Sequence, residues 1–155
     1  MGVEIERKFL LRSDAWREEA DEGVYFHQGY LSTTPERVVR VRQMGERAVV
    51  TIKGKGDGIV RPEFEYDIPL EDAQAMLGQL CLQPTIEKRR HTLRSGPHTW
   101  EIDVFDGENQ GLVVAEIELS SVSETFEKPD WLGDEVSDDS RYLNSNLIAK
   151  PFKTW

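Results

Sequence analysis

Charged residues occupy every second position in a series of short segments, and apolar residues fill most of the positions between them. In the first segment, VEIERKFLL, Glu4, Glu6 and Lys8 alternate with Val3 and Ile5. Side chains on a β-strand point alternately to opposite faces, so the pattern predicts a strand with one charged and one apolar face. The same alternation returns in RVVRVRQ, RAVVTIKG, RPEFEYDI, TIEKRRHTL, HTWEIDVFD and LVVAEIELS.

Turn signals separate these segments, and no low-complexity linker divides them. An eighth strand is expected in YFHQGYL, and Gly45 marks a hairpin between RVVRVRQ and RAVVTIKG. Helices are expected over 13–23, in PLEDAQAMLGQL, where Leu70 and Leu77 fall on one side, and in the tail DDSRYLNSNLIA. The chain is therefore predicted to form a single domain, residues 1–155, of the α+β class with mainly β-structure.

The charged faces carry like-signed pairs on each strand, which is unusual for a sheet face in water because neighbouring like charges repel. A closed, eight-stranded antiparallel β-barrel would set opposite charges across from these pairs, with the apolar faces outward under flanking helices. Such a barrel forms a tunnel with a charged interior. The residues assigned to this interior are Lys8, Arg40, Arg42, Lys53, Lys88, Arg90, Glu4, Glu6, Glu63, Glu65, Asp67, Glu101, Asp103, Glu116 and Glu118, with Tyr30 from the eighth strand.

An interior of both signs suits a multiply charged anion that carries divalent cations. Arginine and lysine hold phosphoryl oxygens, whereas carboxylates hold Mg²⁺ or Mn²⁺, which prefer oxygen ligands. Glu4 and Glu6 are therefore candidate metal ligands, and Lys8 is a candidate phosphate ligand. A strand that shows its charges to water is the competing explanation for VEIERK alone. The recurrence of the pattern in strand after strand favours the charged interior.

The composition excludes several classes of partner. The formal net charge of −10 argues against non-specific binding to nucleic acid or to an anionic membrane. The single cysteine, Cys81, excludes an intrachain disulfide and lies in an apolar stretch, where a buried thiol is expected. The chain shows no secretory signal and no apolar run long enough for a membrane span, so a soluble, cytoplasmic protein is expected.

The ordered set of motifs resembles the CYTH superfamily, the triphosphate tunnel metalloenzymes. The family signature ExExK is present as Glu4, Glu6 and Lys8. The resemblance continues in family order through QGYL, RVR, TIKG, EFEYDI, EKRR, WEIDVF and AEIEL, and so covers nearly the whole chain. The short length and the wording of EIERKFL and QGYL look most like the small bacterial inorganic triphosphatases.

The resemblance implies a tunnel that holds a triphosphate with Mg²⁺ or Mn²⁺. The implied substrate-binding residues are Lys8, Arg40, Arg42, Lys53, Lys88 and Arg90. The implied metal ligands are Glu4, Glu6, Glu63, Glu65, Asp103, Glu116 and Glu118, with Glu101 beside them. Lys88 and Tyr30 are the candidate catalytic pair that protonates the leaving group, with core packing as an equal alternative for Tyr30. Lys55 and Arg61, at the GKGDG turn, are expected to lie in a solvated loop, with a position at the tunnel mouth as the alternative.

The expected activity is hydrolysis of inorganic triphosphate to pyrophosphate and phosphate, by attack of water on the terminal phosphorus. A thiamine triphosphatase and a class IV adenylyl cyclase share the tunnel, and both stay open as alternatives. A non-catalytic polyphosphate-binding module is the second alternative. The expected partner is a small-molecule triphosphate, with no nucleic acid and no membrane, and a homodimer is compatible with the resemblance.

Overall fold

The computed structural model describes residues 2–155, which form nine strands and one α-helix. The α-helix is α1 (Leu70–Gln79). Short 3₁₀ helices make up the other helical segments. The strands are β1 (Val3–Leu11), β2 (Val24–Ser32), β3 (Val38–Met44), β4 (Arg47–Lys53), β5 (Val60–Asp67), β6 (Ile86–Ser95), β7 (His98–Phe105), β8 (Val113–Glu118) and β9 (Leu132–Glu135).

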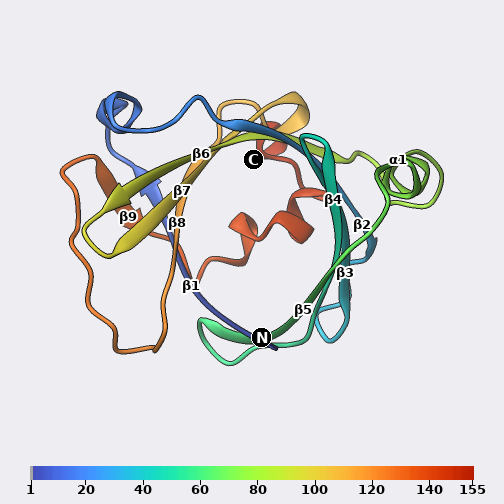
Figure 1. Ribbon diagram of the computed structural model, residues 1–155, viewed down its shortest axis with the longest axis horizontal. Coiled ribbons are helices and arrows are strands. Elements are labelled where there is room, and N and C mark those ends of the chain that lie inside the picture. The colour runs from blue at the N-terminus through green and yellow to red at the C-terminus, as the bar shows by residue number, and fades with distance from the viewer. Residues whose placement is uncertain (1) are drawn as a thin grey trace.

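Eight of the strands close into an antiparallel barrel, as the alternation predicts. The strand order runs β5-β4-β3-β2-β6-β7-β8-β1, and a further pairing of β1 with β5 closes the ring (Figure 1). The first part of β1 pairs with β5, with Glu4 opposite Arg61, whereas the later part pairs with β9, with Phe9 opposite Glu135. The ninth strand lies outside the ring, and the sequence pattern did not predict it.

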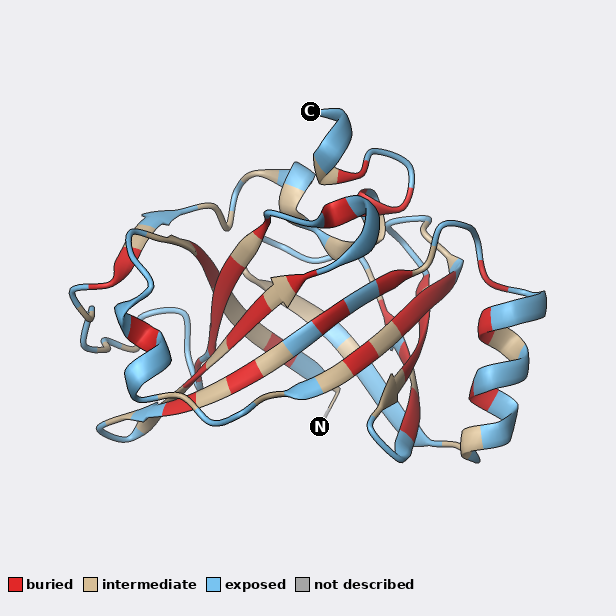
Figure 2. Cartoon of the chain, turned by 90° about the horizontal axis from the view of Figure 1, so that it is seen from above, coloured by how far each residue is buried: buried red, intermediate tan, exposed pale blue. Residues whose placement is uncertain are grey.

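The strand register places the charged residues of neighbouring strands side by side inside the barrel. Lys8 on β1 lies opposite Glu116 on β8, and Arg90 on β6 lies opposite Asp103 on β7. Buried and more exposed residues alternate along the strands as they do in the sequence (Figure 2). Because the side-chain period of a strand is two, a slip of one residue would turn these charges outward. The predicted charged interior is therefore confirmed, except at Asp67, whose side chain is 78% exposed at the end of β5.

One end of the barrel interior is apolar. Here the same inward faces carry uncharged side chains, and the C-terminal segment, residues 136–155, packs onto them from within the outline of the ring (Figure 1). Leu147 is fully buried in this apolar layer, and Ile148 is 6% exposed. The strand residues of the layer are Tyr30, Val38, Ile86, Phe105 and Val114. The layer closes this end over the strands that carry it. Between the C-terminal segment and the turn at 54–61, a pocket of about 300 Å³ remains and reaches Glu4, Glu6 and Lys8.

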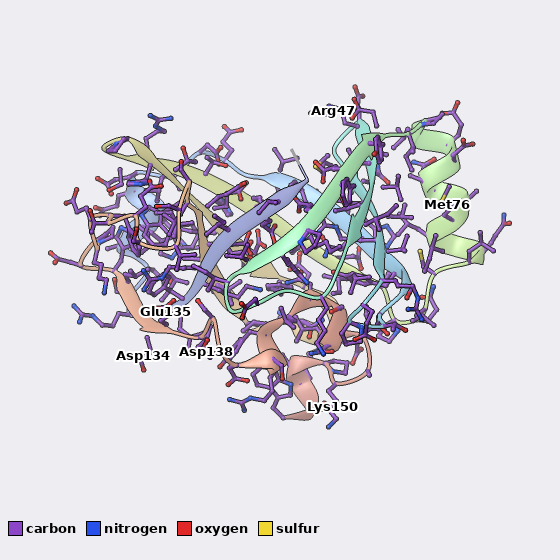
Figure 3. The ribbon with its side chains drawn as sticks, turned by 90° about the horizontal axis from the view of Figure 1, so that it is seen from below. Arg47, Met76, Asp134, Glu135, Asp138 and Lys150 are labelled. Carbon is purple, nitrogen blue, oxygen red and sulfur yellow. The ribbon has the colours of Figure 1, made fainter. Side chains whose placement is uncertain are left out.

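The outer face is only partly covered. Helix α1 packs beside the barrel on β3 and β4, where Ala73 and Leu77 contact Val41 (Figure 3). A Cβ on Gly29 would lie 2.8 Å from the Cβ of Cys81, so this close approach requires glycine. The expected cover over the apolar faces is incomplete at β5, where the outward side chains of Phe64 and Tyr66 are 47% and 59% exposed. No helix among residues 2–155 is long and apolar enough to cross a membrane.

The helix predicted over 13–23 is wrong in length. Only Ala15–Glu18 forms a 3₁₀ turn, around the fully buried Trp16, whose ring packs edge-on against His91 at 5.2 Å. The backbone N–H of Asp21 then donates to the carbonyl of Thr92 on β6. The segment stops being helical because its backbone groups bond to the barrel instead of to the preceding turn.

The predicted closing helix is also wrong. The tail forms two 3₁₀ helices, Ser140–Tyr142 and Asn144–Leu147, separated by Leu143 in an extended conformation. The carbonyl oxygen of Tyr142 accepts a hydrogen bond from Lys8 Nζ at 2.9 Å, so it is used by the barrel interior. Packing of the tail against the end of the barrel is as expected for Leu147, Ile148 and Tyr142, whereas Leu143 remains 36% exposed.

Candidate active site

A cavity of about 260 Å³ occupies the charged part of the barrel interior. All six predicted substrate-binding cations line it, together with Tyr30 and every predicted metal ligand except Asp103. Lining residues that the sequence pattern did not single out include Phe26 of β2, and Asn144 and Ser145 of the C-terminal segment. The cavity therefore combines eight strands with a segment that is distant in sequence.

The positive side of the cavity comes from β3, β2 and β6, which are neighbours in the ring. The guanidinium groups of Arg42 and Arg90 both lie 4.9 Å from the centre of the Phe26 ring, which holds them in place by cation–π contact. Arg42 donates from Nε to the neutral side-chain oxygen of Gln28 at 2.8 Å. The buried Nε of Arg40 has no hydrogen-bond partner among residues 2–155.

Of these cations, Arg42 forms no ion pair with a carboxylate among residues 2–155, whereas Arg40 lies 3.6 Å from Glu65 and Arg90 pairs with Glu101, Asp103 and Glu116. Burial lowers the pKa of Arg42 to about 9, and the charges of Arg40 and Arg90 act in the same direction. A buried guanidinium with a neutral partner and two cationic neighbours costs free energy, which a bound anion would recover. This wall of the cavity can therefore accept an anion.

The negative side comes from β8, β1 and β5, which are also neighbours. Burial raises the pKa of Glu6 well above its usual range, and the adjacent charges of Glu116 and Glu4 raise it further. The pKa of Glu63 is raised by burial and by Glu4, and that of Glu118 is raised by burial, Glu4 and Glu101. Carboxylates that repel one another in this way are oxygen donors whose repulsion a divalent cation would relieve.

Several of these carboxylates are held by cations of the barrel. Lys53 Nζ donates to Glu4 at 3.0 Å, and Arg61 lies 3.4 Å from the other oxygen of Glu4. Arg61 is thus a cavity residue and not a solvent-exposed one, whereas Lys55 is exposed as expected. With these pairs in place, no three Asp, Glu, His or Cys side chains of residues 2–155 converge in a ready metal-binding geometry. A cation would have to exchange with them.

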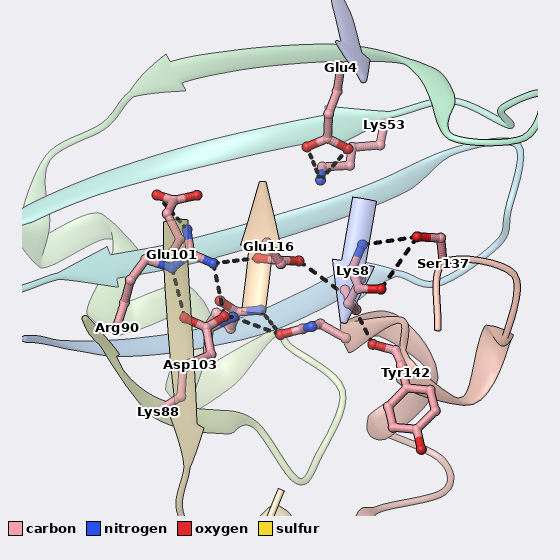
Figure 4. A network of polar contacts seen from close by, with 12 residues as sticks. Glu4, Lys8, Lys53, Lys88, Arg90, Glu101, Asp103, Glu116, Ser137 and Tyr142 are labelled. Carbon is pink, nitrogen blue, oxygen red and sulfur yellow. Dashed lines mark hydrogen bonds and ion pairs between the residues drawn. The ribbon is translucent and has the colours of Figure 1, made fainter. Parts of the chain in front are cut away.

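Asp103 is fully buried and does not line the cavity. It accepts from Arg90 at 2.8 and 2.9 Å and from Lys88 Nζ at 2.7 Å, so both of its oxygens are occupied (Figure 4). Burial alone would raise the pKa of Asp103, but Arg90 and Lys88 lower it to about 2. Its geometry is that of a carboxylate that orients two cations.

Lys88 is 1% exposed and lies between the charged and the apolar layers of the interior. Burial lowers its pKa to about 7, with Arg90 and Arg42 acting in the same direction and Asp103 opposing them. Besides Asp103, its ammonium donates to the side-chain oxygen of Asn144 at 2.9 Å. The Tyr30 hydroxyl, predicted as its partner, accepts instead from Gln28 Nε2 at 3.3 Å.

Comparison with known proteins gives a family for this arrangement. The model of the CYTH domain matches residues 2–150. An inorganic triphosphatase of Acetivibrio thermocellus is 47% identical over 155 residues, which cover 100% of this chain and 99% of that protein. An inorganic triphosphatase of Nitrosomonas europaea is 35% identical over 150 residues, or 94% of this chain and 96% of that protein.

Solved structures agree with the fold. The crystal structure of an inorganic triphosphatase superposes with a TM-score of 0.64 at 32% identity and covers 96% of this chain and 95% of that one. A putative adenylyl cyclase from Hippeastrum superposes with a TM-score of 0.57 at 14% identity, over 78% of this chain and 80% of that one. Likeness at 14% identity shows a shared fold alone. With the family model and a full-length relative in agreement, the chain belongs to the CYTH domain family.

Proposed function

We propose that this protein is a metal-dependent triphosphatase that hydrolyses inorganic triphosphate to pyrophosphate and phosphate. The observation that carries the proposal is the cavity of about 260 Å³, in which one wall holds the buried Arg42 bonded to the neutral Gln28 and the other wall holds carboxylates that repel one another. An anion with bound divalent cations would neutralise both walls, because the anion would pair with the basic residues and the cations with the carboxylates. The two curated relatives that cover nearly the whole chain are both named inorganic triphosphatase.

The basic residues bind and orient the phosphate chain in this proposal. The donors of Arg42 that do not bond to Gln28 are placed to hydrogen-bond phosphate oxygens. Lys8, Lys53 and Arg90 neutralise charge that moves to the bridging and terminal oxygens as the bond to the leaving group breaks. Asp103 acts by positioning Lys88 and Arg90, in place of the metal-binding role that the sequence pattern suggested.

The carboxylates of the opposite wall would hold Mg²⁺ or Mn²⁺. When bound, the metal supplies neutralisation of phosphate charge and an acidified water for in-line attack on the terminal phosphorus. The oxygen-only donor set fits a hard divalent cation. The residues proposed to hold it are Glu4, Glu6, Glu63, Glu65, Glu116 and Glu118.

Lys88 is the proposed proton donor. The attacking water forms the bond to the terminal phosphorus and releases its proton to solvent or to a carboxylate, while the bond to the bridging oxygen breaks. The leaving pyrophosphate takes up a proton from Lys88 Nζ, and Tyr30 supports this end of the site through Gln28 and Asn144. The enzyme then regains its proton from water.

The experiment that tests the function measures phosphate release from tripolyphosphate, thiamine triphosphate and ATP, each with Mg²⁺, with Mn²⁺ and with excess EDTA. We expect the highest kcat/KM on tripolyphosphate and no turnover in EDTA. Faster hydrolysis of thiamine triphosphate, or formation of cyclic AMP and pyrophosphate from ATP, would assign the cavity to an organic triphosphate. Binding of tripolyphosphate without phosphate release under any of these conditions would identify a polyphosphate-binding module.

A further inference from the structure

The C-terminal segment places one amide side chain in the cavity. Asn144 begins the 3₁₀ helix Asn144–Leu147 and lines the cavity together with Leu143 and Ser145. Its side-chain oxygen accepts from Lys88 Nζ at 2.9 Å and from Gln28 Nε2 at 3.1 Å. An ammonium group has only donors, so the oxygen, and not the nitrogen, of this amide must face Lys88.

This contact leaves the amide nitrogen of Asn144 free. Its two N–H donors reach no acceptor within hydrogen-bond distance among residues 2–155. The nitrogen is not one of the fully buried polar atoms that lack a partner, so it is accessible to solvent or ligand. Asn144 itself lines the cavity. The donors therefore face the open space beside Lys88, where a phosphate oxygen would lie.

The segment that carries Asn144 is anchored on both sides. The carbonyl of Tyr142 accepts from Lys8 Nζ at 2.9 Å, so a second cavity cation fixes the backbone before Asn144. After it, Leu147 is fully buried in the apolar layer that closes the barrel. A donor held at this depth by two contacts loses little conformational entropy when a ligand arrives.

We propose that Asn144 is a substrate-binding residue that donates hydrogen bonds from its amide nitrogen to the phosphate chain beside Lys88. The proposal rests on the proposed function, since it assigns the ligand of the same cavity. It gives the C-terminal segment a part in recognising the substrate in addition to closing the barrel. A neutral donor suits this position because a further cation would add to the repulsion among Lys88, Arg90 and Arg42.

The test compares Asn144→Ala with Asn146→Ala. Asn146 is a matched control two positions away, exposed, with its amide nitrogen bonded to the carbonyl of Ser140 outside the cavity. We expect Asn144→Ala to raise KM for tripolyphosphate about tenfold or more, because hydrogen bonds to charged groups are the stronger kind. Asn146→Ala should stay within about twofold of the wild type. A wild-type KM in Asn144→Ala would overturn the proposal.

A second pair separates recognition of the substrate from support of Lys88. Asn144→Asp keeps an acceptor for Lys88 and Gln28 but removes the donors, whereas Ser145→Asp adds the same charge to the cavity wall and leaves the donors in place. We expect Asn144→Asp to weaken binding by a larger factor than Ser145→Asp. Equal effects would mean that Asn144 only supports Lys88, and would contradict the proposal.

Binding is measured independently of turnover. Calorimetric titration with tripolyphosphate in EDTA reports the contacts of the protein with the phosphate chain, and the Tm without ligand identifies variants that fold poorly. If the wild type binds tripolyphosphate but does not hydrolyse it, the proposed function fails while the role of Asn144 is still tested by the titration. If all variants bind like the wild type, the role of Asn144 fails while hydrolysis stands.

Discussion

Adjacent residues on β1 show how sharply side-chain direction divides their roles. Lys8 points into the cavity, 3.3 Å from Glu116, and is 8% exposed. Arg7 points outward, where its guanidinium bonds to Glu135 at 2.6 Å and lies 5.0 Å from the centre of the Phe126 ring. The two side chains have the same charge and nearly the same length. Only the alternation of side chains along the strand makes one a cavity residue and the other a surface contact.

Substitution of Lys8 and Glu6 should impair the enzyme in different ways. Lys8→Ala should lower kcat/KM on tripolyphosphate by about one to two orders of magnitude, since a hydrogen bond to a charged group contributes roughly 1.5–3 kcal/mol. Glu6→Ala should raise the Mg²⁺ concentration needed for half-maximal activity and lower kcat at saturating substrate. Steady-state kinetics with a Mg²⁺ titration measures both effects.

Arg7→Ala is the control for these variants. It removes a cation from the same strand, but from a partly exposed pair outside the cavity, so kinetics should match the wild type and stability should fall by no more than about 1 kcal/mol. If Lys8→Ala and Arg7→Ala behave alike, the assignment of the inner face of β1 to the substrate is wrong.

The protonation of Lys88 should appear in the pH profile. Its pKa is about 7 in the free protein, because of burial and the charges of Arg90 and Arg42, and the proposed mechanism needs the protonated form. The active fraction therefore falls as the pH rises, and kcat/KM should decline above about pH 7. The corresponding decline in kcat should begin at higher pH, because a bound polyanion favours the ammonium form.

Lys88→Arg tests this assignment, since a guanidinium stays charged throughout the range but is a poor proton donor. The variant should lose the decline in kcat/KM above neutral pH and have a lower kcat at all pH values. The measurement is the pH profile of kcat/KM and of kcat for the wild type and the variant, at constant free Mg²⁺. A decline that persists unchanged in the variant would show that another group causes it.

At the scale of elements, the C-terminal segment behaves unlike the strands. Its residues pack onto the barrel through single side chains, Leu147 and Ile148 in the apolar layer and Asn144 in the cavity, and not through a continuous helical face. The short 3₁₀ turns allow this because each turn can direct one residue inward. The strands need no such irregularity, since their alternation supplies inward residues at every second position.

Leu147 should therefore carry much of the stability of this element. Leu147→Ala should lower the free energy of unfolding by about 2–5 kcal/mol, because it leaves a cavity in a closed apolar layer. Leu143→Ala, at a position that is 36% exposed, should change it by about 0.5 kcal/mol or less. Urea denaturation compares the two. Equal losses would mean that the segment is held mainly by its backbone contacts.

At the scale of the whole molecule, like charges lie close together on two opposite walls of the barrel interior, carboxylates on one and guanidinium groups on the other. The raised pKa of Glu6 and the lowered pKa of Arg42 have the same two causes, which are burial and nearby like charges. Folding must offset this cost through the apolar layers that surround the cavity. Ligands that neutralise both walls should therefore stabilise the folded state.

Mg²⁺ and a phosphate anion should stabilise the protein cooperatively. Pyrophosphate is a suitable probe because the proposed reaction releases it and does not consume it. Together, at concentrations about a hundredfold above Kd, the two should raise the Tm by about 5–10 °C, more than the sum of their separate effects. Differential scanning calorimetry measures these shifts. Additive or absent shifts would argue against neighbouring metal and anion sites.

Much of the barrel and its lining could be predicted from the order of residues alone. Arg40, Lys88 and Glu116 face inward as predicted, because the side-chain period of two sets their face wherever one face is buried. The Gly45 hairpin and helix α1 likewise follow from local signals, a turn residue with φ of 60° and an apolar stripe. The two other expected helices were wrong. In the first segment the N–H of Asp21 bonds to Thr92 of the barrel, and in the tail the short-range backbone bonds form 3₁₀ turns interrupted at Leu143.

The remaining features depend on contacts between distant parts of the chain. Nothing near Asn144 in the sequence marks it as the partner of Lys88, 56 positions away, and nothing near Tyr142 links its carbonyl to Lys8, 134 positions away. The alternation predicted that Asp103 faces the interior, but it did not predict that Arg90 and Lys88 bond to both of its oxygens. The sequence by itself determined which side chains face the tunnel, because that depends on local geometry. Only the tertiary structure decided which charges pair and which remain free, because that depends on distances across the closed ring.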